Sequence, residues 1–201
     1  MKKQYILLLA AAGLLTFGQT ALRAQNSGTA GGTMDAHIIA PITLTWEHPL
    51  NFGVFTTPTG PVVLEEDAPA TPITALNVNN INQAPTFVSG AGNTALTNTA
   101  QFSAGANGNP GPSIWYVTGM LNAFYSITLP ASSITVTGQN FGKTMTVDLF
   151  QAYIGGSPVL GGQLTSGLGY QYFAVGGRLH ADATDVPDSY VGNFTVQVTY
   201  N

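Results

Sequence analysis

The chain has 201 residues, of which only 7% are charged, with five basic residues against nine acidic ones and no cysteine. So few cations cannot neutralise a run of phosphates, which argues against a nucleic-acid-binding protein. The absence of cysteine excludes disulfide frameworks, thiol catalysis and cysteine-ligated zinc. A chain of this length can bury roughly 70% of its unfolded surface in one core, so it does not depend on such cross-links.

The first 24 residues have the organisation of a secretory signal peptide. Lys2 and Lys3 precede a mostly apolar run at residues 5–17, and small and polar residues lead to a cleavage point after Ala24. The run is shorter than the ~20 residues that a membrane-spanning helix needs, so a permanent anchor is the less favoured alternative. We therefore expect an exported protein in the periplasm, at the cell surface or outside the cell, with no membrane span in the mature chain.

Cleavage at this point would make the mature chain markedly acidic. Two basic residues, Lys143 and Arg178, would remain against nine acids, a net charge of −7 with neutral histidines. This balance argues against nucleic acid and also against electrostatic docking on anionic lipid.

The mature chain contains many short β-type runs separated by glycine, proline and asparagine. Residues 25–34 form a Gly/Ser/Thr-rich lead-in, and residues 155–169 form a long glycine-rich connection. Pro41 cannot donate to a ladder, so the first strand should lie at an edge or be bulged there. The pattern predicts strands at residues 36–46, 50–53, 62–64, 73–78, 86–88, 100–103, 114–118, 124–129, 134–137, 144–150, 172–180 and 191–200.

Alternation of apolar and polar residues indicates which side of each strand is buried. In residues 144–150 the predicted inward set is Met145, Val147 and Leu149. The last run has the clearest period of two, and its inward set comprises Phe194, Val196, Val198 and Tyr200. A strand with one buried face and one solvent-exposed face is typical of an antiparallel sheet. We predict an all-β fold in which residues 35–201 form a single antiparallel, immunoglobulin-like β-sandwich of roughly seven to ten strands.

The residue types that usually carry catalysis occur without their motifs. His37, His48 and His180 form no H-x-x-x-H or H-E-x-x-H pattern, and no serine lies in G-x-S-x-G or S-x-x-K. The glycine-rich stretches lack the strand–loop–helix context of a phosphate-binding loop. We therefore expect no enzymatic activity and no cofactor.

Two groups of side chains could bind a ligand. Asp182, Asp185 and Asp188 lie three residues apart in a turn-like stretch, and carboxylates are ligands that calcium prefers, although acids in loops are usually only solvated.

The second group comprises Trp46, Trp115 and Tyr116. Flat aromatic rings with a polar edge can form a platform that binds a sugar. Their alternative role is in the core or at its margin, where aromatic side chains are common.

Several segments together resemble a family of uncharacterised exported bacterial domains. They are A-P-I at residues 40–42, L-N-F-G at 50–53, Y-S-I-T-L-P at 125–130, V-G-G-R-L at 175–179 and Y-V-G-N-F-T-V-Q-V-T-Y-N at 190–201. The chain departs at Ser189, where the family often has glycine. The resemblance implies a β-sandwich, and because this family has no established enzymatic activity it supplies no catalytic residues.

The C-terminal segment also distantly resembles that of spore-coat-U-type proteins and chaperone–usher pilins, which end in an alternating strand with a penultimate tyrosine, here Tyr200. That resemblance implies that Phe194, Val196, Val198 and Tyr200 form a region that pairs with another strand. The polar lead-in at residues 25–33 departs from the apolar N-terminal arm of pilins. Two alternatives stay open: a neighbouring subunit supplies the paired strand, or residues 36–46 of the same chain complete the sandwich.

These observations favour an exported, non-enzymatic structural or adhesin-like surface protein. Its expected partners are other surface or pilus-like subunits, bound through edge-strand pairing. The alternative is a secreted β-sandwich module that binds a glycan or another ligand.

Overall fold

The computed structural model describes residues 31–69, 73, 83, 85–88, 109–165, 167 and 169–201. The chain divides into two units, residues 1–38 and 39–201, and all the strands belong to the second. Every strand pair is antiparallel, and the described residues contain no α-helix. Accordingly, none of them forms a helix long and apolar enough to cross a bilayer. The predicted all-β, antiparallel sandwich-like fold is confirmed.

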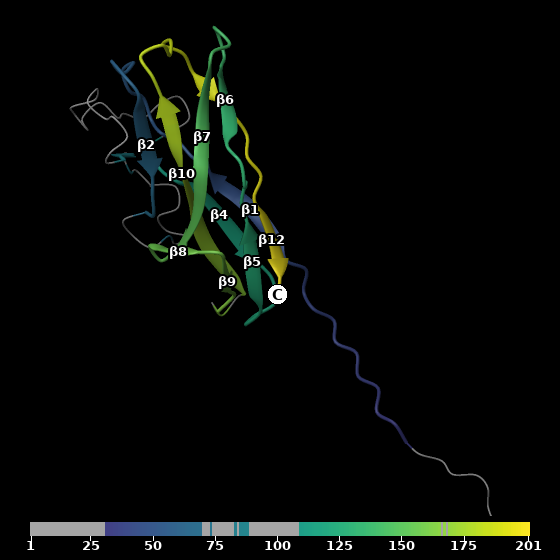
Figure 1. Ribbon diagram of the computed structural model, residues 1–201. Helices are drawn as coiled ribbons and strands as arrows, with labels where there is room; N and C mark the ends of the chain where they lie inside the picture. The colour runs from purple at the N-terminus through teal and green to yellow at the C-terminus, as the bar shows by residue number, and fades with distance from the viewer. Residues whose placement is uncertain are drawn as a thin grey trace, which may run out of the picture. The chain divides into compact units, whose positions relative to one another are not determined.

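The larger sheet has nine strands and is built around the long strand β10 (Figure 1). Its main path runs β1-β4-β10-β7-β6-β11, while β2 pairs with β10, β3 with β2, and β8 with β7. The strands are β1 Thr43–His48, β2 Val62–Glu66, β3 Thr86–Phe87, β4 Ser113–Thr118, β6 Ile134–Gly138, β7 Thr144–Ile154, β8 Ser157–Val159, β10 Tyr170–Ala181 and β11 Tyr190–Val191.

The smaller sheet has three strands in the order β12-β5-β9. These are β5 Phe124–Thr128, β9 Gly161–Gln163 and β12 Gln197–Tyr200. Apolar side chains from both sheets meet in one buried cluster: Val117, Ala152, Phe173 and Val175 come from the larger sheet, and Tyr125 and Ile127 from the smaller, with Leu164 and Val196 from the connections. This shared core joins the two sheets into a sandwich.

A β-bulge corrects the predicted inward face of β7. Between Gly176 and Arg178 of β10, strand β7 contains one residue more than its partner. The extra residue lies around Leu149, which has a positive φ of 48° and is 63% exposed. The prediction that Leu149 faces inward with Met145 and Val147 is therefore wrong, because a bulge breaks the period of two. Phe150 points inward instead and contacts two of the buried clusters.

The C-terminal run is also not the single strand that its alternation predicted. Val191 ends β11, which pairs with β6 in the larger sheet, whereas β12 pairs with β5 in the smaller one. Figure 1 shows this crossing as the yellow segment that runs from beside β6 to β12. At Gly192 a Cβ atom would lie 2.8 Å from Val136 Cγ1 and 2.9 Å from the Thr135 carbonyl oxygen, so glycine permits the close departure from β6.

Other expectations differ in their bounds. The first strand begins at Thr43 and lies at a sheet edge, as Pro41 predicted. Residues 50–53 contribute only a bridge between Asn51 and Gly111, and the connection at 155–169 contains β8 and β9. The strand predicted at 86–88 is β3, and those predicted at 73–78 and 100–103 lie outside the described residues apart from Ile73.

Glu66 is a buried acid at the end of β2. It is 1% exposed, and neither carboxyl oxygen has a hydrogen-bond partner among the residues that the structure describes. Burial, with a smaller contribution from the neighbouring charge of Asp67, raises the pKa of Glu66 from 4.5 to about 9. The carboxyl group is therefore neutral in the folded protein at neutral pH, and folding must take up a proton there.

This proton uptake gives a testable pH dependence. Because the folded pKa lies above the unfolded value, the stabilising contribution is complete below about pH 4.5 and is lost as the pH rises toward 9. Glu66→Gln mimics the neutral acid, so it should raise the melting temperature at pH 8 and flatten the profile between pH 5 and 9. The control Glu65→Gln removes the charge of a half-buried carboxylate whose Oε1 lies 3.0 Å from Arg178 Nε, and it should keep the slope. An unchanged slope in Glu66→Gln would contradict the assignment.

Candidate functional site

The outer edge of β12 is the candidate site, because no described strand pairs with the backbone on that side. β5 is the one strand of the described chain with which β12 pairs. Asn201 N–H donates to the Phe124 carbonyl at 3.1 Å, whereas Ile127 N–H donates away from β12 to the Leu160 carbonyl at 2.8 Å. In an antiparallel ladder the bonded pairs alternate. The N–H and C=O groups of Val198 and Tyr200 therefore point outward, away from β5.

The predicted pairing residues anchor this edge to the core. Val196 is 8% exposed and belongs to the shared core, against which Phe194, Val198 and Tyr200 pack. Val198 and Tyr200 lie in β12 opposite Ile127 and Tyr125 of β5, while Phe194 and Val196 precede the strand. The side chains thus hold β12 in place while its outward backbone stays available.

Phe194 fixes the point where the chain crosses between the sheets. Its ring stacks on Phe150 with centroids 5.1 Å apart and meets Trp115 edge-on at 6.1 Å. Beside it lies a groove of about 320 Å³ whose apolar lining includes Leu129, Pro130 and Ile134. No charged side chain lines this groove. The lining combines these apolar residues and Phe194 with polar Thr128, Asn193, Thr195 and Gln197, so the groove can receive both apolar and polar side chains of a bound segment.

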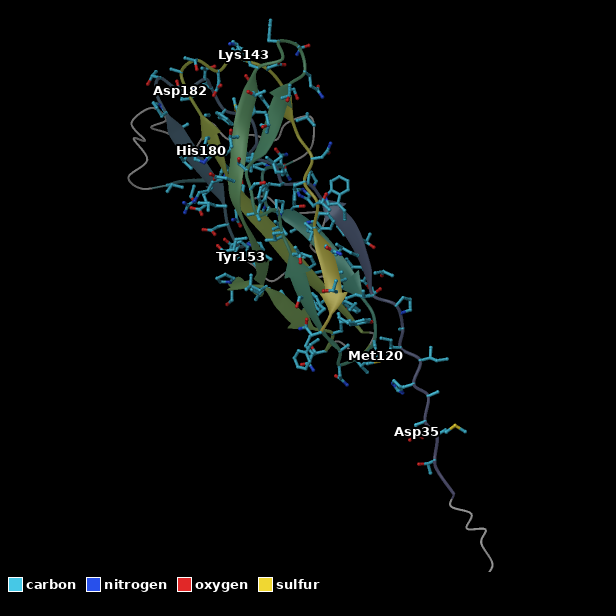
Figure 2. The ribbon with its side chains drawn as sticks, turned by 45° about the vertical axis from the view of Figure 1, so that its right-hand side comes forward. Asp35, Met120, Lys143, Tyr153, His180 and Asp182 are labelled. Carbon is cyan, nitrogen blue, oxygen red and sulfur yellow. The ribbon has the colours of Figure 1, made fainter. Side chains whose placement is uncertain are left out.

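Tyr200 closes one end of the sandwich. Its hydroxyl accepts from Met120 N–H at 2.7 Å and donates to the Ala40 carbonyl at 2.8 Å. Figure 2 shows Met120 at the end of the sandwich opposite Lys143 and Asp182. A Cβ atom at Gly119 would lie 2.2 Å from this hydroxyl, so glycine is required there for the contact. The tyrosine holds the last strand, the β4–β5 connection and the approach to β1 together.

The β1 edge of the larger sheet differs from the β12 edge of the smaller sheet. β1 follows Pro41, contains Glu47 and has an irregular register between Trp46 and His48. Proline, charge and bulges are among the features that oppose unwanted pairing at sheet edges. β12 contains none of these three features. Of the two edges, β12 is therefore the one suited to a partner strand.

The three aspartates considered as calcium ligands accept hydrogen bonds from backbone N–H groups. Asp188 accepts from Asn140 N–H and Phe141 N–H, both at 2.9 Å, and from Ser189 N–H at 2.8 Å. Desolvation raises the pKa of Asp188, but these hydrogen bonds outweigh it and hold the pKa below its usual value.

The other two aspartates bond within their own turn. Asp185 Oδ2 accepts from Asp182 N–H at 2.6 Å, and Asp182 Oδ1 accepts from Thr184 N–H at 3.2 Å. Nowhere in the described ranges do three or more histidine or acidic side chains gather as metal ligands would.

The histidines are dispersed as well. His180 Nε2 lies 2.9 Å from Asp148 Oδ1 on β7, in an exposed pair rather than with a loop aspartate (Figure 2 labels His180). His48 Nδ1 contacts the Pro49 carbonyl oxygen at 2.8 Å, and His37 is exposed.

The predicted aromatic platform is divided between two faces. Trp46 and Trp115 are cross-strand neighbours, and Trp115 packs on the shared core while Trp46 is 56% exposed. Tyr116 follows Trp115 directly and therefore points to the opposite face. There it meets Tyr172 at 4.8 Å and Tyr170 at 5.4 Å between ring centroids. Sequence reasoning missed this tyrosine cluster because its members lie far apart in the chain and become neighbours only through the pairing of β4 with β10.

The hydroxyl of Tyr200 gives a direct test of how β12 is held. Tyr200→Phe removes two hydrogen bonds and should lower the free energy of unfolding by about 1–3 kcal/mol in denaturant titrations. Tyr190→Phe removes the single bond from its hydroxyl to the Val186 carbonyl at 2.8 Å, and it should cost about half as much. An unchanged stability in Tyr200→Phe would show that the hydroxyl does not hold β12.

Comparison with known proteins gives one match. A family model described as "Domain of unknown function (DUF4402)" matches residues 42–200, a span that includes all the strands of both sheets. No curated protein and no solved structure matches the chain. Because the family model covers most of the chain, the predicted membership of an uncharacterised domain family is confirmed: the chain belongs to DUF4402, a family of domains of unknown function.

Proposed function

We propose that this protein is an exported structural or adhesin-like surface subunit that associates through the outer edge of β12. The observation that carries the proposal is the contrast between the β1 edge and the β12 edge: β1 has a proline before it, a charge and an irregular register, and β12 has none of these. Exposed edges without such features pair readily with other strands. In a protein selected to stay monomeric, β12 would be expected to have them.

The composition of the chain supports association between copies. Only 7% of its residues are charged, and low charge reduces the repulsion that keeps surfaces apart. The distant resemblance of residues 190–201 to the ends of pilin subunits agrees with a role in strand pairing. Export rests on the signal-peptide pattern of the first 24 residues.

The buried and partly buried polar groups support a structural role. Tyr153 donates to Asp67 and Gln151, Tyr125 donates to Gln171 at 2.9 Å, and Asp188 holds the turn between β6 and β7. These groups join neighbouring strands and turns to one another. They lie apart and do not converge on a common space where a substrate would bind, so the proposal is non-enzymatic.

Association and location test this proposal together. Protein purified from cells that express the full chain should form concentration-dependent oligomers in size-exclusion chromatography with light scattering, and short fibres or clusters in negative-stain images. Fractionation and surface proteolysis of the native cells should find it outside the cytoplasm. A strictly monomeric protein at high micromolar concentration that is absent from the cell surface would overturn the proposal.

The tyrosine cluster favours a second candidate function, the binding of a neutral glycan. Tyr116, Tyr170 and Tyr172 form contiguous rings on β4 and β10, with Thr45 of β1 directly opposite Tyr116 in the ladder. Aromatic rings provide apolar faces for sugar rings, and hydroxyl groups provide hydrogen bonds.

A glycan array tests this second candidate. The expected result is selective binding of neutral glycans that Tyr116→Ala reduces at least tenfold. Phe141→Ala is the control, because Phe141 is 68% exposed in the turn between β6 and β7, away from the cluster. Its binding should equal that of the unmodified protein. An array without hits, or equal loss in both variants, would remove this candidate.

A further inference from the structure

Three tyrosine rings contact one another on the paired strands β4 and β10. Tyr116 lies directly opposite Tyr172 in this ladder, and their ring centroids are 4.8 Å apart at an interplanar angle of 43°. Contacting aromatic rings usually have centroids roughly 4.5–7 Å apart, so this pair is near the closest approach. Tyr170 lies 5.4 Å from Tyr116 and 6.2 Å from Tyr172. Within the described residues, tyrosine rings contact one another here and at no other place.

Tyr116 and Tyr172 occupy the kind of position in which two side chains of a sheet approach most closely. Directly opposite residues direct their side chains toward the same face, with Cβ atoms about 4.5–5.5 Å apart. The two phenol rings therefore leave the sheet side by side, and each has oxidisable carbon atoms next to its hydroxyl group. Both side chains are partly exposed, so a small oxidant can reach them from solvent.

The composition of the chain and the surroundings of Tyr172 determine how the pair reacts. The chain contains no cysteine, so no thiol competes for an oxidant and no disulfide can join its strands. Burial, followed by the nearby charge of Glu47, raises the pKa of the Tyr172 phenol, which is therefore uncharged at neutral pH. Oxidation then removes an electron and a proton together and leaves a neutral phenoxyl radical. Of the other described tyrosine rings, that of Tyr116 lies nearest to it.

We propose that Tyr116 and Tyr172 are a site of oxidative cross-linking, at which hydrogen peroxide and a haem peroxidase join β4 to β10 through a carbon–carbon bond between the two rings. Each phenol loses one hydrogen atom, and hydrogen peroxide takes up both and becomes two water molecules. The two phenoxyl radicals couple at ring carbons next to the phenol oxygens. The hydrogen on each of these carbons then moves as a proton to the phenol oxygen, so the product is dityrosine with both hydroxyl groups restored.

The cross-link would strengthen the centre of the larger sheet. Strand β10 pairs with β2, β4 and β7, so a bond between β4 and β10 acts where most of this sheet is joined. A covalent bond between residues far apart in the chain restricts the unfolded state, as a disulfide does, and thereby stabilises the fold. In a chain that is exported, as proposed, and has no cysteine, dityrosine would take the place of a disulfide. The reaction itself does not depend on association through β12.

Oxidation of the purified full chain tests the proposal. Treatment with a haem peroxidase and hydrogen peroxide should produce dityrosine fluorescence in protein that migrates as a single chain on a denaturing gel. The mass of that chain should fall by the mass of two hydrogen atoms, and its melting temperature should rise. Tyr116→Phe and Tyr172→Phe keep the ring but lack the phenol, so each should lower the fluorescence yield at least tenfold. The matched controls Tyr170→Phe and Tyr190→Phe should keep the yield of the unmodified protein.

Three results would overturn the proposal. An unchanged yield in Tyr172→Phe would assign the cross-link to another pair of tyrosines. Fluorescence confined to chains that are joined to one another would show that the tyrosines react between copies rather than across β4 and β10. A lack of dityrosine under conditions that couple free tyrosine would show that the two rings do not reach the geometry for coupling. None of these results bears on association through β12, which is measured separately on unoxidised protein.

Discussion

The packing of Phe194 against Phe150 and Trp115 is the interaction on which the rest of the architecture depends. Phe150 contacts the core shared by the two sheets and also the second buried cluster around Val62, Leu64 and Met145. Phe194 anchors the C-terminal segment to these clusters. It lies between β11, which pairs with β6, and β12, which pairs with β5. Burial of these large rings removes apolar area from water, which is the main stabilising term in such a fold. Where the rings sit decides where the chain crosses from one sheet to the other.

That arrangement depends on the bulge at Leu149. A regular strand would direct Leu149 inward and Phe150 outward, since side chains alternate. The additional residue in β7 reverses this order, leaves Leu149 63% exposed and turns Phe150 toward Phe194. The strain of a leucine at φ 48° is offset by the burial of the larger aromatic ring.

The sequence predicted the fold class and most strands well, because alternation and turn residues are local signals. It placed β4, β5, β6 and β7 within a few residues, and Pro41 correctly indicated an edge. The prediction failed where one alternating pattern spans two segments that pair with different strands. Residues 191–200 alternate without interruption, yet Val191 pairs with β6 and Val198 with β5. Local periodicity reports which side chains are buried, but it contains no information on which sheet buries them.

The same limit applies to the candidate site. The sequence identified Val198 and Tyr200 as strand-forming residues, but the contrast between edges required the topology. The tyrosine cluster required it as well, since Tyr116 and Tyr172 are neighbours only because β4 pairs with β10. Conversely, three aspartates close in sequence suggested a shared ligand, and in the structure their oxygens bond to separate backbone groups.

The distribution of charge connects fold and proposed assembly. The charged side chains that the strands contain, such as Glu47, Glu65, Asp148 and Arg178, all lie in the larger sheet, whereas β5, β9 and β12 contain none. A sheet without charged side chains does not repel an added strand electrostatically. With only three strands, the smaller sheet also has few interstrand hydrogen bonds to stabilise it. Addition of a fourth strand at β12 would widen the weaker layer and satisfy its outward backbone groups in one step. The smaller sheet is thus both the layer that gains most from a partner and the one that does least to exclude it.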